Sequence, residues 1–141
     1  MIPIAAVPIS FGEILSLTRK LAFGNLLDES HVTELENELA NYVGLKRVFA
    51  CNSGRTALYL AIKALELDPG DEVLVPAYTC AIVFEMILRA GLKPVFVDVN
   101  LETCNLNVEL IPKVLTKKTK AIVPVHLFGR PCDMDPIIDA A

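Results

Sequence analysis

The stretch that decides the fold is residues 72–99, which read EVLVPAYTCAIVFEMILRAGLKPVFVDV. Glu72 to Val75 is a short apolar run before a proline and predicts a strand. Thr79 to Ala90 predicts a mostly apolar helix, and Pro94 to Val99 predicts a second strand. Both strands are continuous apolar runs with no polar alternation. This pattern is typical of parallel strands that are buried on both faces of a sheet.

The same alternation continues on both sides of this stretch. Arg47 to Ala50 and Lys120 to Leu127 are predicted strands, and Thr56 to Leu67 and Met134 to Ala141 are predicted helices. Strand and helix therefore alternate four times, which predicts an α/β fold of three layers, with a mostly parallel sheet between helices. The helix expected at 56–67 is apolar on nearly every side, so we expect it to be buried.

Two further helices are predicted nearer the N-terminus. Apolar residues recur at helical spacing from Phe11 to Phe23, and Gly24-Asn25 would end that helix. The second is an amphipathic helix that Ser30 would cap and Gly44 would stop, with its apolar stripe facing a surface.

The composition is unusually apolar for a chain of this size. The 141 residues are 53% hydrophobic and 21% charged, with a mean hydropathy of +0.49. A small domain buries a smaller share of its surface than a large one, so it should be more polar than average. The composition excludes a disordered chain and a coiled coil, and the net charge of −4 excludes a basic module that binds nucleic acid. The excess suggests that these residues belong to a larger core than they can close alone.

The sequence predicts a cytoplasmic protein with no membrane segment. No stretch reaches the roughly 18 apolar residues of a membrane helix. Residues 1–8 have two prolines and no leading basic residue, unlike a signal peptide. Four irregularly spaced cysteines and only two histidines argue for reduced thiols and against a zinc site; the cysteines are Cys51, Cys80, Cys104 and Cys132.

A first group of candidate binding residues lies where the predicted strand at 47–50 passes into a helix. It comprises Ser53, Gly54, Arg55 and Thr56. A helix start offers unpaired amide protons and partial positive charge, and glycine lets a ligand approach the backbone closely. With two hydroxyls and a cation added, this junction predicts an anion site. The alternative is an ordinary helix start capped by Ser53.

A second group follows the strand that ends at Pro76. Ligand sites in open α/β sheets collect at the carboxyl ends of the strands, so we expect Ser53 and Thr79 at one edge of the sheet. Tyr78 is a flat aromatic that could cover a ring. The alternative is a core tyrosine followed by a helix cap at Thr79.

Two further residues at strand ends have competing interpretations. His126 could act as a general base for Cys51 or Cys80 in a hydrolase. The alternative for His126 is a structural histidine. Asp98 is expected to be a turn or cap residue.

Six segments, in this order and spacing, resemble the DegT/StrS-type sugar-nucleotide aminotransferases, which are pyridoxal-phosphate (PLP) enzymes of fold type I. The resemblance begins at about Ser30 and covers about the first third of such an enzyme. The segments are Asn52-Ser53-Gly54-x-x-Ala57-Leu58, Pro69-Gly70-Asp71-Glu72-Val73, Val75-Pro76-Ala77-Tyr78-Thr79, Pro94-Val95-Phe96-Val97-Asp98, Thr119 to Gly129, and Asp133-Met134-Asp135.

The resemblance implies a cofactor, substrates and partners. It implies PLP, an amino donor such as glutamate, a keto sugar nucleotide as acceptor, and a homodimer. The Ser53–Thr56 junction would bind the cofactor phosphate, although Arg55 stands where the family has threonine. Thr79 would lie beside the cofactor. Cys80 stands where the family often has the aromatic residue that stacks on the pyridine ring, which leaves Tyr78 as the candidate for stacking.

The resemblance also implies how the chain is divided. Residues 1–29 would form an N-terminal arm and helix, and residues 30–141 an incomplete N-terminal part of the PLP-binding large domain. The lysine that binds the cofactor covalently would lie beyond residue 141, so no catalytic residue is assigned and this N-terminal fragment is expected to be inactive alone. The alternative is a truncated, non-catalytic binding or assembly module that self-associates.

Overall fold

The computed structural model describes residues 10–24 and 29–141. Its contacts divide the chain into two compact units, Met1–Ala50 and Cys51–Ala141, which are described separately.

Helix α1 (Phe11–Phe23) of the first unit begins at a capping box. Glu13 N donates to Ser10 Oγ at 3.3 Å, and Ser10 N donates to Glu13 Oε2 at 2.6 Å. The hydrogen bond from the Ser10 backbone lowers the pKa of Glu13. The helix ends before Gly24, as predicted, while Asn25 lies outside the described residues.

Helix α2 (Ser30–Val43) starts one residue earlier than predicted. Ser30 was expected as the cap, but it is the first helical residue and Glu29 occupies the cap position. The reason is that Glu29 O already accepts hydrogen bonds from Val32 N and Thr33 N, each at 3.1 Å. The predicted stop at Gly44 is confirmed, because its φ of +72° is a conformation that glycine adopts without strain.

The predicted strand at Arg47–Ala50 is wrong. A strand needs a neighbouring strand to bond its backbone groups, and none pairs with these residues in the described part of the chain. The Ala50 N–H donates instead to Glu36 Oε1 of α2, at 2.7 Å.

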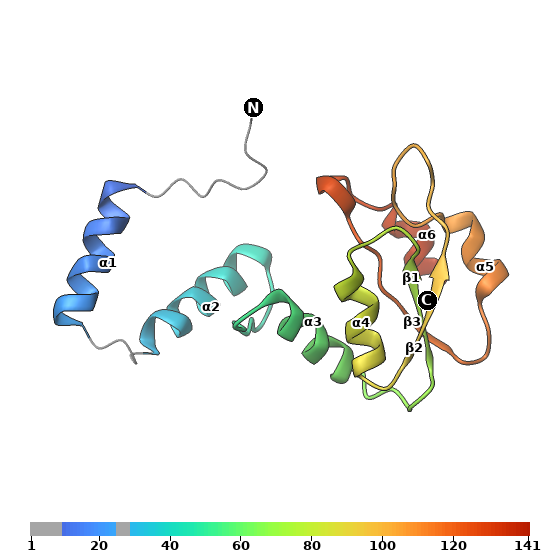
Figure 1. The fold of residues 1–141 in the computed structure, drawn as a ribbon, viewed down its shortest axis with the longest axis horizontal. Coiled ribbons are helices and arrows are strands. Elements are labelled where there is room, and N and C mark those ends of the chain that lie inside the picture. The colour runs from blue at the N-terminus through green and yellow to red at the C-terminus, as the bar shows by residue number, and fades with distance from the viewer. Residues whose placement is uncertain (1–9, 25–28) are drawn as a thin grey trace. The chain divides into compact units, whose positions relative to one another are not determined.

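The second unit is built on a three-stranded parallel sheet of order β2-β1-β3 (Figure 1). The strands are β1 (Glu72–Pro76), β2 (Lys93–Val97) and β3 (Thr119–Ile122). All five residues of the central β1 are buried, which confirms the interpretation of its continuous apolar run. β3 is shorter than predicted: it ends at Ile122, residues 123–126 belong to neither a strand nor a helix, and a 3-10 helix, η2 (Leu127–Gly129), follows.

Helices cover both faces of this sheet, so the predicted three-layer α/β fold is confirmed. α3 (Gly54–Lys63) and α4 (Ala81–Arg89) pack over Val73 and Val75 on one face. Leu74 points to the other face, where it packs with residues that follow β2 and β3. The elements of that layer are η1 (Val108–Leu110), α5 (Ile111–Val114) and α6 (Met134–Asp139).

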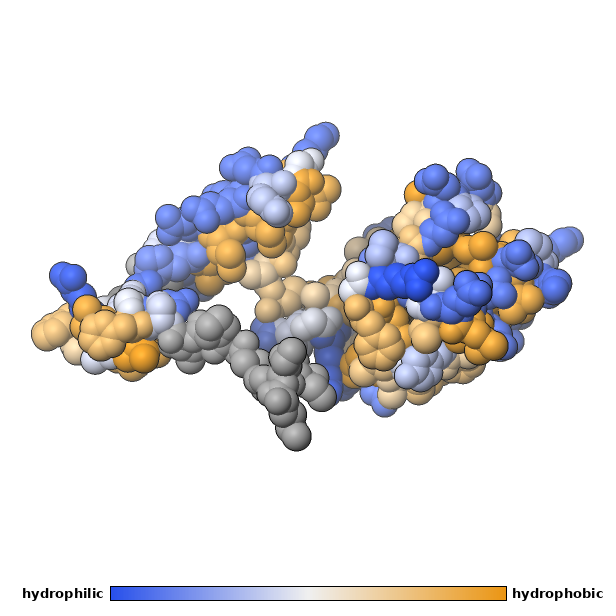
Figure 2. All heavy atoms as spheres, turned by 90° about the horizontal axis from the view of Figure 1, so that it is seen from above, coloured by the Kyte–Doolittle hydropathy of each residue, from blue (hydrophilic) through white to orange (hydrophobic). Residues whose placement is uncertain are grey.

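The expectation that the helix after Ser53 is buried is wrong. Ile62 is the only buried residue of α3, and Leu60 is 51% exposed. One side of α3 packs against α4 and β1, and the other elements of the second unit leave its opposite side uncovered. The helix also ends at Lys63 rather than at Leu67. Figure 2 shows apolar side chains at the surface of this protein.

Candidate functional site

The first predicted junction forms the start of α3. Ser53 is the N-cap, and its Oγ accepts from Thr56 N at 3.2 Å and lies 3.1 Å from Thr56 Oγ1. This confirms Ser53 as a helix cap. A Cβ added at Gly54 would meet no atom within 4 Å, so the backbone is open to a close approach. The remaining amides of the first turn point out of the helix end, where they favour an anion.

Arg55 and Thr56 also line a hollow between α3 and α4. The other residues around it are Tyr59, Met86 and Arg89. Within the described ranges, no carboxylate lies within 4.0 Å of the Arg55 or Arg89 guanidinium. The α3 start therefore combines a helix end, hydroxyl groups and an unneutralised cation, a donor set that suits a phosphate.

The second junction lies between β1 and α4. Tyr78 is 54% exposed, so the alternative of a core tyrosine is wrong. The cap position of α4 is Cys80 rather than Thr79, and Cys80 makes no side-chain capping bond. Thr79 Oγ1 is buried and has no hydrogen-bond partner among the residues that the structure describes. An unpaired buried hydroxyl costs about 1–3 kcal/mol, so this atom is suited to a bound group that completes its hydrogen bonding.

The two junctions are not joined by a direct contact. No hydrogen bond connects residues 53–56 to residues 78–80, all of which the structure describes. The hollow beside Arg55 and Thr56 includes Arg89, the last residue of α4, whereas Thr79 precedes the first residue of α4; Figure 1 shows α3 and α4. A single site formed by both junctions stays a prediction.

The hydrolase interpretation of His126 finds no support in the geometry. His126 Nδ1 accepts a hydrogen bond from Cys132 N at 2.9 Å, and His126 bonds neither Cys51 nor Cys80. Asp98 Oδ1 accepts from Val99 N at 2.8 Å, as expected for a turn residue. Among the described residues, no group of three or more His, Cys, Asp and Glu side chains is arranged to hold a metal ion.

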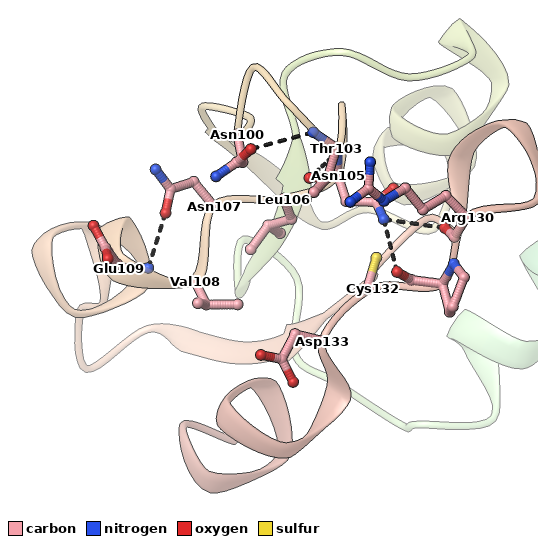
Figure 3. A pocket seen from close by; sticks show the side chains of 11 residues that line it. Asn100, Thr103, Asn105, Leu106, Asn107, Val108, Glu109, Arg130, Cys132 and Asp133 are labelled. Carbon is pink, nitrogen blue, oxygen red and sulfur yellow. Dashed lines mark hydrogen bonds between the residues drawn. The ribbon is translucent and has the colours of Figure 1, made fainter.

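Sequence reasoning missed the buried Asn105, which organises a polar hollow beside the sheet (Figure 3). Its side chain bonds three backbone groups of the segment that follows β3. No periodicity or motif marked this residue, because its partners lie more than 20 positions away along the chain.

Comparison with known proteins agrees with this fold. A family model described as the DegT/DnrJ/EryC1/StrS aminotransferase family matches residues 12–141. The chain belongs to this family.

Three relatives illustrate the extent of the similarity. A GDP-perosamine synthase of Caulobacter vibrioides is 44% identical over 110 residues, which cover 78% of this chain and 30% of that protein. A UDP-2-acetamido-2-deoxy-3-oxo-D-glucuronate aminotransferase of Pseudomonas aeruginosa is 40% identical, with 86% and 34% covered. The PLP form of a Streptococcus pneumoniae protein, described as a sugar aminotransferase, superposes with a TM-score of 0.90 at 34% identity, covering 99% of this chain and 36% of that one. The chain thus spans about a third of the length of the proteins it matches.

Proposed function

We propose that this chain contributes the N-terminal part of the cofactor domain of a PLP-dependent enzyme. The enzyme would transfer an amino group from an amino acid such as glutamate to a keto sugar nucleotide. The observation that carries the proposal is the match of the family model to residues 12–141. The two curated relatives described above, whose names refer to GDP- and UDP-sugar chemistry, support the substrate class.

The start of α3 would hold the phosphate of the cofactor. Ser53 and Thr56 keep their hydroxyl groups at this helix end, and Gly54 leaves the backbone open. Arg55 would add a positive charge, because no carboxylate in the described residues neutralises it. Bound PLP would supply an electron sink that stabilises negative charge at the reacting carbon.

The residues after β1 would contact the rest of the cofactor. The Thr79 hydroxyl would form the hydrogen bond that it lacks within the described protein. Tyr78 offers an exposed ring that could lie against the cofactor ring, and Cys80 lies at the start of α4 beside it.

The proposal includes the domain division, the assembly and the location. Residues 1–29 would form an arm and helix, and residues 30–141 part of the large domain.

A homodimer is supported by the apolar side chains left exposed on α3. A cytoplasmic location is supported by the four cysteines, which are all free thiols. No helix among the described residues is long and apolar enough to span a membrane.

The proposal is tested by a chimeric enzyme. The 110-residue aligned segment of the Caulobacter relative would be replaced by its counterpart from this chain, and amino transfer from glutamate to the keto sugar nucleotide would be measured. We expect PLP binding and activity. A chimera that folds, by circular dichroism, yet binds no PLP would contradict the proposal.

Variants at Thr79 make this test specific. Thr79→Val removes the buried hydroxyl at nearly constant volume and should weaken PLP binding about tenfold. Thr79→Ser keeps the hydroxyl and is the matched control. Equal affinities of the two variants for PLP would show that the Thr79 hydroxyl does not contact the cofactor.

A second candidate function is a non-catalytic module that self-associates. It is favoured by the large apolar side chains exposed in both units, including Phe11, Leu60 and Leu65. Light scattering on the 141-residue chain tests it, since a monodisperse monomer would contradict self-association. In the same sample, borohydride reduction after PLP addition should give no stoichiometric adduct on one lysine, because none of the lysines here is assigned to the cofactor.

A further inference from the structure

The segment that follows β3 is fixed by hydrogen bonds from a distant loop. Asn105 Nδ2 donates to Arg130 O and to Pro131 O, each at 3.0 Å, and Asn105 Oδ1 accepts from Leu127 N at 3.2 Å. Asn105 itself is buried. One side chain therefore satisfies three backbone groups of a segment more than 20 residues away, which holds residues 127–131 in one conformation (Figure 3).

Two more hydrogen bonds hold this segment, one to the loop that contains Glu102 and one between residues on either side of the segment. Arg130 Nη1 donates to Glu102 O at 3.0 Å, and Cys132 Sγ donates to Val125 O at 3.2 Å. Burial raises the pKa of the Cys132 thiol, which keeps this donor protonated. Phe128 is held at φ 54°, ψ 26°, a conformation that a non-glycine residue keeps only when its surroundings enforce it.

His126 lies at the start of this fixed segment, and its tautomer follows from geometry. The Cys132 amide is a donor, and it lies 2.9 Å from His126 Nδ1. Nδ1 therefore accepts and carries no proton, so the proton of the neutral ring is on Nε2. The His126 side chain is exposed, and its Nε2–H is a donor with no partner in the described residues.

The sheet places this donor at the same edge as the second junction. β1 and β3 are parallel neighbours, with Leu74 opposite Ile122 and Val123 N donating to Leu74 O at 2.8 Å. The residues that follow the two strands, Thr79 after β1 and His126 after β3, therefore leave the sheet at one carboxyl edge.

We propose that His126 donates a hydrogen bond from Nε2 to an oxygen of the cofactor whose site includes Thr79. This inference rests on the proposed function, because that function supplies the cofactor. In it, Asn105 is a positioning residue, since it holds the segment without touching the ligand.

The competing explanation is that His126 only accepts the hydrogen bond from the Cys132 amide and thereby stabilises the fold. Two substitutions separate the two roles. The side-chain oxygen of Asn can replace Nδ1, and the side-chain nitrogen of Gln can replace Nε2. His126→Asn therefore keeps the structural contact and loses the donor, whereas His126→Gln keeps the donor and loses the structural contact.

The experiment is a titration of the full 141-residue chain with pyridoxamine 5′-phosphate, followed by NMR. This probe has the ring and phosphate oxygens but no aldehyde, so it forms no adduct with lysines. We expect a shift of the His126 Nε2 resonance together with the amides of Gly54 and Thr79. His126→Asn should raise the dissociation constant about tenfold with little change in melting temperature. His126→Gln should bind more tightly than His126→Asn while melting lower.

Other outcomes separate the two claims. Shifts at Gly54 and Thr79 without a shift at His126 would overturn the role of His126 and leave the proposed function standing. The same holds if His126→Asn binds as well as the unsubstituted chain. An absence of shifts at all three residues would count against both the cofactor site and the role of His126.

Discussion

Glu72 of β1 and Lys93 of β2 lie opposite each other in the parallel ladder, with Lys93 Nζ 2.9 Å from Glu72 Oε1. The other carboxylate oxygen of Glu72 accepts from Thr116 Oγ1 at 2.6 Å. A carboxylate in the first position of the central strand is thus bonded from both sides. It links β1 to the edge strand β2 and to the turn before β3.

These contacts predict a stability that depends on pH. The hydrogen bond from Thr116, and then the one from Lys93, lower the pKa of Glu72 below its ordinary value of 4.5. Their stabilisation is present above pH 4.5 and is lost as the pH falls through the lowered pKa. The reason is that the Glu72 carboxylate of the unfolded chain takes up a proton at a higher pH than that of the folded chain, which favours unfolding. Urea unfolding between pH 7 and pH 3 should therefore show a loss of stability that Glu72→Gln reduces. Glu102→Gln, whose hydrogen bonds use its backbone, should retain the original pH dependence.

Removal of the Asn105 side chain should destabilise the segment after β3. Asn105→Ala leaves two carbonyls and one amide without their partner, which we expect to cost about 2–3 kcal/mol. Asn107→Ala is the control, because Asn107 only caps η1, with its Oδ1 accepting from Glu109 N at 3.1 Å. Asn107→Ala should lower the free energy of unfolding by about 1 kcal/mol. Similar free energies of unfolding for the two variants would contradict the role assigned to Asn105.

The cap of α3 should contribute a measurable amount to local stability. Ser53→Ala removes the acceptor for Thr56 N, and we expect a cost of about 1 kcal/mol. Ser53→Asp restores an acceptor at the same place. Hydrogen exchange of the Thr56 amide should be faster in Ser53→Ala and close to normal in Ser53→Asp; equal rates in both variants would argue against the cap.

Adjacent residues on α4 should respond very differently to truncation. Ile87 is fully buried between α4 and the sheet, whereas Leu88 is 55% exposed. Ile87→Ala should cost about 2–5 kcal/mol through lost packing and a cavity. Leu88→Ala should change the free energy of unfolding by about 0.5 kcal/mol. A large effect at Leu88 would mean that a second surface covers it in solution.

Much of the second unit could be predicted from residues close together in the sequence. The run Glu72 to Pro76 is uniformly apolar after its first residue, and burial on both faces is what such a run requires. Local signals likewise located the N-cap of α3 at Ser53 and, in the first unit, the end of α2 at Gly44. In each case the physical cause acts within about four residues of the position it determines.

The predictions from the sequence were wrong where strand pairing or burial depended on a partner far along the chain. Arg47 to Ala50 has the composition of a strand but pairs with no strand among the described residues. The apolar helix α3 was expected to be buried, yet burial requires a second surface to cover it.

The sequence by itself determined the class of fold, the helix start capped by Ser53, the junction between β1 and α4 that carries Thr79, and the family resemblance. Only the tertiary structure decided that the Thr79 hydroxyl is buried with no partner in the described part of the chain, and that Asn105 fixes the segment after His126. The tautomer of His126 likewise follows from the position of the Cys132 amide. The reason is that hydrogen bonding and burial depend on which distant groups become neighbours, whereas helix caps, turns and apolar runs depend on adjacent residues.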